Sequence, residues 1–382
     1  MSAGEKRMFS NTPAKFDFNE RPFIVIWETT QACDLVCVHC RACAQPLRSR
    51  LELSTPEAKG LMDEIADMQV PLFVLTGGDP LKRPDIYELV EYAAQRGLRI
   101  SVTPSATPLL TQEAIAKLKG AGLMRLAVSL DGSSAAIHDA FRGVRGSYEW
   151  TLRAIRWARE IALPVQVNTT ITRRNLEDVD DLARLLATLD IVLWSVFFLV
   201  PTGRGRADDL VSAEEFESVF ARLYEVSRRA PFDLKTTEAQ HYRRYVAQRR
   251  AEERRRNPSA ASVARTSAFE VRGSPDGIGR APRGLNDGKG FVFISHKGDV
   301  YPSGFLPLAA GNIRAQSLQE IYRNSPLFIA LRDTSNLKGK CGECEFREIC
   351  GGSRARAYAL TGDPFAEEPC CVYAPKALPV PA

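Results

Sequence analysis

The chain has 382 residues, of which 45% are hydrophobic, a composition that is ordinary for a globular protein with a sizeable core. Its formal net charge of +5 is too small an excess to indicate a nucleic-acid partner. The longest apolar run, Ile191–Val200, is far shorter than a membrane span, and residues 1–20 lack the apolar core of a signal peptide. We therefore expect a cytoplasmic protein without a membrane partner.

After an arm over residues 1–20, runs rich in β-branched and aromatic residues alternate with amphipathic helical patterns. The first helix should begin after Ser54, because Ser54 and Glu57 have the spacing of a capping box. Strands that alternate with helices predict a parallel sheet with right-handed crossovers, although this pattern alone does not distinguish an open sheet from a barrel. The expected strands are Phe23–Trp27, Leu72–Leu75, Leu98–Thr103, Arg125–Leu130, Val165–Thr170 and Leu193–Val200, and the further helices are Pro84–Gln95, Gln112–Lys119, Tyr148–Ile161 and Leu176–Leu189.

Residues 213–256 have a helical pattern whose end is rich in arginine. Such a run usually forms a solvated helix face, and the alternative is an anion-binding lid over a substrate that carries carboxylates. Residues 257–283 have the composition of a mobile loop or linker. A β-hairpin over Phe291–Pro302 and a short helix over Leu318–Tyr322 are expected to follow. The arginines are Arg243, Arg244, Arg249, Arg250, Arg254, Arg255 and Arg256.

Nine cysteines gather near the two ends of the chain, and none lies between Cys43 and Cys341. Structural thiols would be expected to scatter more evenly, so the grouping indicates metal or redox chemistry rather than a disulfide framework. Cys33, Cys37 and Cys40 form a C-x3-C-x2-C motif directly after the first expected strand.

Three thiolates can hold three irons of a four-iron cluster and leave the fourth iron open to another ligand. Zinc sites more often combine one C-x2-C pair with a second pair, so a zinc knuckle is the less favoured alternative. In this motif the sequence resembles the radical S-adenosylmethionine (SAM) enzymes, in which SAM binds the open iron of a [4Fe-4S] cluster. The resemblance needs only Cys33, Cys37 and Cys40, so Cys43 is interpreted as a bystander.

The resemblance implies an α/β fold: a partial (β/α)6 barrel with the cluster in the loop after the first strand. It also implies that the reduced cluster cleaves SAM to a 5′-deoxyadenosyl radical, which removes hydrogen from a substrate. We expect four segments: an arm over residues 1–20, the barrel over 21–230, a basic helix and flexible linker over 231–285, and a small cysteine-rich domain of β-hairpin and helix over 286–382.

Gly77, Gly78 and Asp79 follow the second expected strand. Glycine lets the backbone approach a ligand closely, and a carboxylate can accept a hydrogen bond from an ammonium group. In the radical SAM family this loop binds the amino group of SAM, usually with glutamate where Asp79 stands. The shorter acid is a small departure from that pattern, and a plain turn is the alternative reading of the loop.

Ser129 stands at the end of the fourth expected strand, at a position where the radical SAM enzymes that this sequence resembles contact the ribose of SAM. Arg142 matches the arginine that pairs with the methionine carboxylate, a task suited to the bidentate geometry of guanidinium. The resemblance also implies three further contacts with SAM, from His39 and Leu199 beside the adenine and from Asn168 at the ribose. We do not expect His39 to act as a catalytic base.

Cys341, Cys344 and Cys350 form a C-x2-C-x5-C motif, and Cys370 and Cys371 follow. Four thiolates from this segment could make a structural zinc site. After the expected hairpin, however, the motif resembles the SPASM domain, whose full form holds two auxiliary four-iron clusters. The sequence does not decide whether Cys370 or Cys371 is the fourth ligand.

Two positions depart from the full SPASM pattern. Ser303 and Arg354 stand where that pattern has cysteines, and both losses affect the same auxiliary cluster. We therefore expect one auxiliary [4Fe-4S] cluster, with a complete set of ligands and a role in electron transfer.

The substrate is open to three interpretations. Segments that include Trp27–Thr30, Cys37–Ala42 and Tyr301–Pro307 look most like the branch that modifies tetrapyrroles, and Arg243 and Arg244 could meet its propionates. A peptide maturase is the rival, although only about twenty residues precede the barrel, too few for a fused peptide-recognition domain. An iron–sulfur or zinc module without SAM turnover is the third. A small electron donor such as ferredoxin or flavodoxin is implied for either enzyme.

Overall fold

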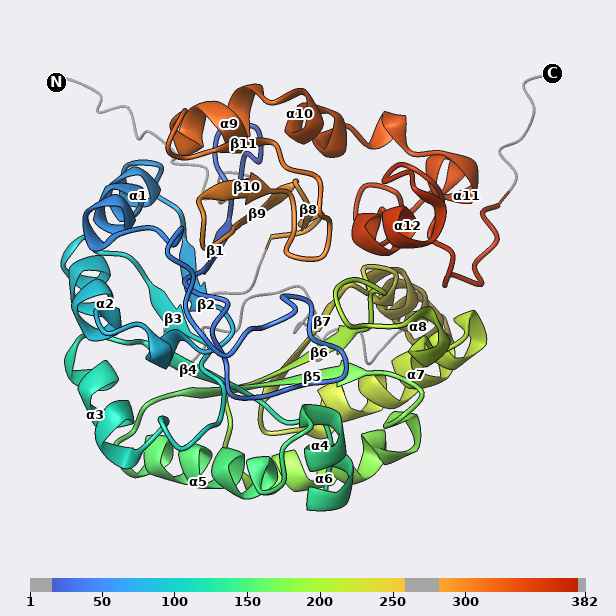
Figure 1. Cartoon of the computed structure of the whole chain (residues 1–382). Helices are drawn as coiled ribbons and strands as arrows, with labels where there is room; N and C mark the ends of the chain where they lie inside the picture. The colour runs from blue at the N-terminus through green and yellow to red at the C-terminus, as the bar shows by residue number, and fades with distance from the viewer. Residues whose placement is uncertain (1–15, 258–281, 377–382) are drawn as a thin grey trace, which may run out of the picture.

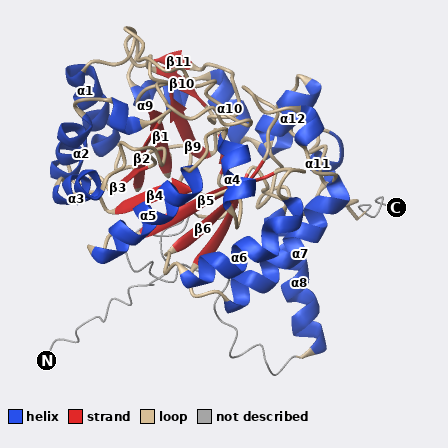
Figure 2. Cartoon of the chain, turned by 60° about the horizontal axis from the view of Figure 1, so that its bottom comes forward, coloured by secondary structure: helices blue, strands red, loops and turns tan. Residues whose placement is uncertain are grey.

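The computed structural model describes residues 16–257 and 282–376. Seven parallel strands follow one another across a curved sheet, and helices cover its outer side (Figures 1 and 2). The strands are β1 (Ile24–Glu28), β2 (Leu72–Thr76), β3 (Ile100–Val102), β4 (Arg125–Ser129), β5 (Val165–Ile171), β6 (Leu193–Phe198) and β7 (Asp233–Thr237). The helices are α1 (Thr55–Asp67), α2 (Ile86–Gln95), α3 (Gln112–Gly120), α4 (Ala135–Arg142), α5 (Ser147–Glu160), α6 (Val179–Thr188), α7 (Ala213–Arg229) and α8 (Tyr242–Arg256).

The predicted parallel sheet and its six strands are confirmed, with shifts of a few residues at their ends. The capping box at the start of α1 is also present, because Ser54 and Glu57 each accept the other's backbone N–H. The prediction that residues 213–256 are helical throughout is wrong, because β7 separates α7 from α8 and pairs with β6. Helix α4 was not expected as a separate element.

The hairpin of the C-terminal part extends the barrel sheet. It is formed by β9 (Gly290–Ile294) and β10 (Asp299–Tyr301), and β9 pairs in parallel with β1. The remaining elements are β8 (Asn286–Asp287), β11 (Gly311–Asn312), α9 (Leu318–Asn324), α10 (Pro326–Arg332), α11 (Gly339–Glu343) and α12 (Arg354–Thr361). The expected linker over residues 257–283 lies almost wholly outside the described residues.

The two faces of the barrel strands have different surroundings. Side chains such as Trp27, Phe73 and Trp194 face the helices and belong to one large buried core. Because successive side chains of a strand alternate, their neighbours face the inside of the barrel, and these include the polar residues Asn168 and Ser195. None of the helices in the described residues is long and apolar enough to cross a membrane.

Candidate active site

The loop that carries Cys33, Cys37 and Cys40 follows β1 and lies across the C-terminal end of the barrel, where ligand sites of parallel α/β barrels are found (Figure 1). Its two ends are tied together, because the Cys33 N–H donates to Gln45 O at 2.8 Å and the Gln45 N–H donates to Gln31 O at 2.9 Å. The three cysteines are thus presented by one closed loop at the strand end.

The glycines after β2 bring a second loop against this one. The Gly78 N–H donates to Thr30 O at 2.7 Å, and the Asp79 N–H donates to Ala32 O at 2.6 Å. A Cβ atom on Gly77 would lie 2.5 Å from Thr30 O, and one on Gly78 would lie 2.4 Å from Ala32 O. The glycines therefore serve a close approach between two backbones, and their approach to a ligand stays a prediction.

Two further contacts with the cysteine loop could not be predicted. Helix α4 ends against the loop, where the Val38 N–H donates to Phe141 O at 3.0 Å. After β6, the Arg204 N–H donates to Cys40 O at 3.0 Å, and its Nε donates to Cys37 O at 2.9 Å. A glycine at positive φ lies beside the loop at each contact, Gly143 or Gly203, but a glycine in the sequence does not by itself show which segment it approaches.

The first two thiols are buried, whereas Cys40 is partly exposed. Burial raises the pKa of Cys33 and Cys37, although neighbours oppose this effect. Ser105 Oγ lies 3.2 Å from Cys33 Sγ, and Arg142 Nη1 lies 3.7 Å from Cys37 Sγ. Arg142 is therefore placed to favour the thiolate form of Cys37.

A cavity lies beside the loop, at the ends of three strands, β2, β3 and β4. Its lining includes Thr76, Gly77, Gly78, Thr103, Ser129 and Arg142. Four of the eight predicted cofactor-binding residues thus meet at one cavity that opens next to the cysteines. Arg142 also forms an ion pair with the fully buried Asp131, so its guanidinium joins Asp131 to Cys37.

The other four predicted residues are not among those that line this cavity. Asp79 is fully buried, and its carboxylate accepts from Leu81 N–H at 3.2 Å and from Thr107 Oγ1 at 3.0 Å. Burial raises the pKa of Asp79 to about 6. Asp79 therefore holds the loop itself, and its bond to a ligand's ammonium stays a prediction.

His39, Asn168 and Leu199 also have protein partners. The His39 ring packs on the Phe141 ring with centroids 4.6 Å apart, and burial lowers the pKa of His39 to about 4. Asn168 accepts a hydrogen bond from Gln166 at 2.7 Å inside the barrel, and the Leu199 carbonyl accepts from Arg356 at 3.3 Å. A neutral, packed His39 agrees with the expectation that it is not a base.

Cys33, Cys37 and Cys40 are the ligand set that this loop offers to a cluster. Among the described residues, no group of three or more His, Cys, Asp or Glu side chains is close enough to hold one metal ion. A four-iron cluster places each thiolate on a different iron, so its ligands stand farther apart than those of one ion. Cys33, Cys37 and Cys40 share one small apolar cluster, in which Cys40 is the most exposed.

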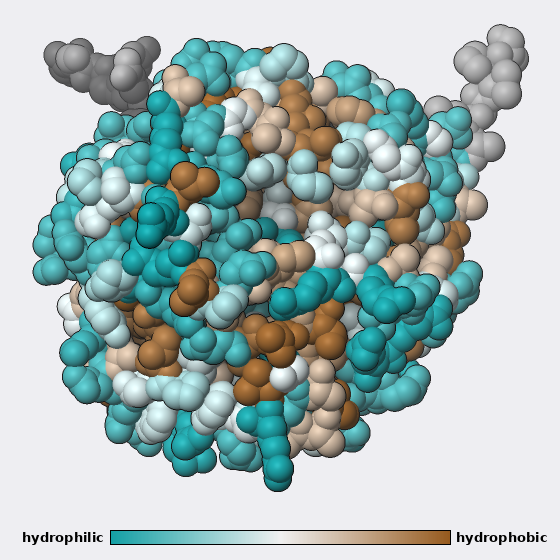
Figure 3. Space-filling model, in the orientation of Figure 1, coloured by the Kyte–Doolittle hydropathy of each residue, from teal (hydrophilic) through white to brown (hydrophobic). Residues whose placement is uncertain are grey.

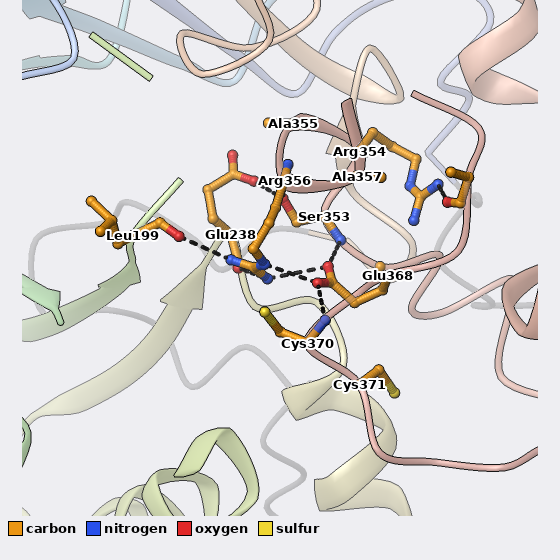
Figure 4. Close-up of polar contacts among 12 residues, drawn as sticks. Leu199, Glu238, Ser353, Arg354, Ala355, Arg356, Ala357, Glu368, Cys370 and Cys371 are labelled. Carbon is orange, nitrogen blue, oxygen red and sulfur yellow. Dashed lines mark hydrogen bonds and ion pairs between the residues drawn. The ribbon is translucent and has the colours of Figure 1, made fainter. Parts of the chain in front are cut away.

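The C-terminal cysteines surround a second cavity. Cys341, Cys344, Cys350 and Cys371 line it, whereas Cys370 is not among the lining residues. Figure 4 shows the sulfur atoms of Cys370 and Cys371 on opposite sides of the chain, with Cys370 toward Arg356. Burial raises the pKa of Cys370 to about 11, and its place outside the lining is what separates it from the other four cysteines.

Two arginines that were expected to meet substrate carboxylates instead support this second cavity. Arg243 Nη1 donates to Leu285 O at 2.7 Å and to Ile349 O at 3.1 Å. Arg244 lines the cavity and is ion-paired with Glu217. A contact of these arginines with substrate carboxylates is disfavoured, because partly buried protein groups already bind both guanidinium groups.

The two positions that depart from the full SPASM pattern also have protein partners. Arg354 is buried, and its Nη1 donates to Pro364 O at 2.9 Å and to Ala366 O at 2.7 Å (Figure 4). Ser303 donates to the carboxylate of Glu238 at 3.3 Å. A buried polar network, rather than a set of thiols, thus stands at these positions.

Comparison with known proteins agrees with this geometry. Residues 27–186 match the Radical SAM superfamily, and residues 286–345 match the SPASM iron–sulfur cluster-binding domain. The AdoMet-dependent heme synthase of Methanosarcina barkeri (strain Fusaro) is 42% identical over 354 residues, which cover 93% of this chain and 97% of that protein. The PqqA peptide cyclase of Rhodopseudomonas palustris is 31% identical, over 93% of this chain and 88% of that protein.

The fold has solved counterparts. The crystal structure of Streptococcus suis SuiB bound to S-adenosylmethionine superposes with a TM-score of 0.68 at 16% identity, over 93% of this chain and 78% of that one. The radical SAM match implies SAM and a [4Fe-4S] cluster, and the SPASM match implies auxiliary cluster binding. The chain therefore belongs to the radical SAM superfamily, among its SPASM-domain enzymes and close to the branch that modifies tetrapyrroles.

Proposed function

We propose that this oxidoreductase decarboxylates propionate side chains of an iron porphyrin oxidatively, in the biosynthesis of a haem-type cofactor. The observation that carries the proposal is the 42% identity to a heme synthase over nearly the whole length of both chains. The peptide cyclase relative is 31% identical, so a peptide maturase is the second candidate. A binding module without turnover is disfavoured, because Gly77, Gly78, Ser129 and Arg142 line one cavity beside the cysteine loop.

Cys33, Cys37 and Cys40 would hold the first cluster, and the adjoining cavity would hold SAM. When bound, these groups supply a 5′-deoxyadenosyl radical that removes a hydrogen atom from the substrate. Arg142 contacts both Asp131 and Cys37, and its positive charge favours the thiolate form of Cys37, which is the form that would bind iron. Ser129 and the backbone of Gly77 and Gly78, which line the cavity, would orient SAM from the strand ends.

A small electron donor such as ferredoxin or flavodoxin would reduce the first cluster. The cysteine loop reaches the surface, because Val36 within it has a relative exposure of 59% and Leu47 just beyond it has 80%. On the face shown in Figure 3, hydrophobic side chains form small separate groups among hydrophilic ones, a surface suited to a transient partner. Thiolate ligands need a reducing compartment, so we propose a cytoplasmic location.

The test is anaerobic incubation of the reconstituted enzyme with SAM, dithionite and iron coproporphyrin III. Formation of 5′-deoxyadenosine together with a decarboxylated, vinyl-bearing porphyrin would support the proposal. Formation of 5′-deoxyadenosine with an unchanged porphyrin would favour the peptide maturase. No 5′-deoxyadenosine under any condition would favour the binding module.

We further propose that the single auxiliary [4Fe-4S] cluster is held by Cys341, Cys344, Cys350 and Cys371, and that it serves electron transfer. Cys371→Ala should lower the iron content toward that of the first cluster alone and change the electron paramagnetic resonance spectrum of the reduced protein. Cys370→Ala is the matched control, because its sulfur points toward Arg356 instead of the cavity. Equal iron loss in both variants, or loss only in the control, would contradict this ligand assignment.

A further inference from the structure

One lysine inside the barrel has no partner among the residues that the structure describes. Lys235 is exposed on β7, whereas its neighbour Leu234 packs against the core beneath the helices. Because side chains alternate along a strand, Lys235 faces the inside of the barrel. Within residues 16–257 and 282–376, no hydrogen bond or ion pair reaches its ammonium group, and the charge of Arg125 acts on it.

The strand register places Lys235 on the wall that also carries the proposed SAM site. Ser129 pairs with Asn168, Asn168 pairs with Ser195, and Ser195 pairs with Lys235, so these four residues form one row on the inner face of the sheet. Ser129, at the other end of the row, lines the cavity beside the cysteine loop. Three strand spacings separate the ends, which is roughly 14 Å along the sheet.

The surroundings of Lys235 favour a ligand that carries a carboxylate on an apolar body. Water reaches the Lys235 side chain, but the barrel wall around it partly desolvates the ammonium group and, with a contribution from Arg125, lowers its pKa to about 8, so an anion beside it would relieve an unfavourable charge. Ser195 Oγ, next to Lys235 in the register, is fully buried and has no hydrogen-bond partner. Farther along the inner face of β6, the rings of Phe197 and Phe305 lie 6.3 Å apart and offer aromatic surface.

We propose that Lys235, together with Ser195 Oγ, binds a carboxylate of the substrate other than the one that reacts, and so sets which side chain reaches the SAM cavity. This inference rests on the proposed function, because it takes a substrate with several carboxylates on a flat apolar ring. The distance along the row separates the anchored carboxylate from the reacting one. It also assigns to Lys235 the role that is disfavoured for Arg243 and Arg244.

The test is an anaerobic visible-absorption titration of the holoenzyme with iron coproporphyrin III and with its tetramethyl ester, which has no free carboxylate. Lys235→Gln should weaken binding of the acid by roughly 10- to 100-fold, the range of a charge-assisted hydrogen bond, and leave binding of the ester unchanged. Lys235→Arg should restore most of the affinity. Lys117→Gln, on the solvent-facing side of α3 and ion-paired with Glu113, is the matched control and should have no effect.

The outcomes separate the two proposals. If the wild type binds the acid and Lys235→Gln binds it equally well, the anchor is wrong and the proposed function stands. If Lys235→Gln weakens binding of the acid and of the ester by the same factor, Lys235 acts through the fold, and its role as the carboxylate anchor is wrong. If the wild type binds neither compound, the proposed function fails, and the anchor that rests on it fails too.

Discussion

Replacing Cys37 with alanine is expected to abolish the formation of 5′-deoxyadenosine from SAM while leaving about four irons per chain at the C-terminal site. The physical reason is that a cluster with only two protein ligands in this loop is not retained. Cys37 is also the buried thiol that Arg142 contacts, so no nearby cysteine can replace it. The measurements are anaerobic chromatography of the reaction products and iron analysis of the purified variant.

Cys43→Ala is the matched control. Cys43 lies three residues after Cys40 but is exposed, and it adopts a positive φ of 48°. It should retain SAM cleavage and the full iron content. Cleavage by Cys37→Ala at the wild-type rate would show that the loop does not hold the reactive cluster.

Replacing Arg356 with methionine should lower the free energy of unfolding by about 3–5 kcal/mol, the cost of leaving one partner of a buried ion pair unpaired. Arg356 is fully buried, and its Nε donates to Glu368 Oε1 at 2.8 Å. Its Nη2 also donates to the Glu238 carbonyl at 2.7 Å, so the side chain joins the C-terminal domain to the loop after β7 (Figure 4). Chemical denaturation of the anaerobic holoprotein measures the loss.

A surface ion pair is the control for this variant. Arg314 pairs with Glu57, and both side chains are 38% exposed. Arg314→Met should therefore cost only about 0–1 kcal/mol. If Arg356→Met unfolds at the same denaturant concentration as the wild type, the buried pair does not hold the domain in place.

The sequence predicts those barrel strands whose residues are apolar on both faces or form a long run rich in β-branched and aromatic residues. It misses β7 because Asp233, Lys235 and Thr237 place polar side chains inside the barrel, so no apolar run marks the strand. Because this segment is predicted to be helical, Lys235 is expected to be an ordinary solvated lysine, and nothing in the sequence places it inside the barrel. An expectation based on apolar runs therefore fails where the inner wall is polar.

The candidate site is predictable as a set of residue types but not as a set of contacts. The spacing of Cys33, Cys37 and Cys40 identifies the loop, yet nothing in the sequence shows that Arg204 donates to its backbone. Adjacent cysteines illustrate the same limit. The sequence gives no reason to prefer Cys370 or Cys371 as a ligand. In the structure the side chain of Cys370 points toward Arg356, whereas Cys371 lines the second cavity.

Hydrogen abstraction from the substrate is tested most directly with an iron porphyrin whose propionate side chains carry deuterium on the carbon that bonds to the ring. The labelled compound is incubated anaerobically with the enzyme, SAM and dithionite, and 5′-deoxyadenosine is analysed by mass spectrometry. The proposed decarboxylation predicts that deuterium appears in 5′-deoxyadenosine in proportion to the vinyl porphyrin formed. Unlabelled 5′-deoxyadenosine, formed at the same rate with and without the porphyrin, would contradict it.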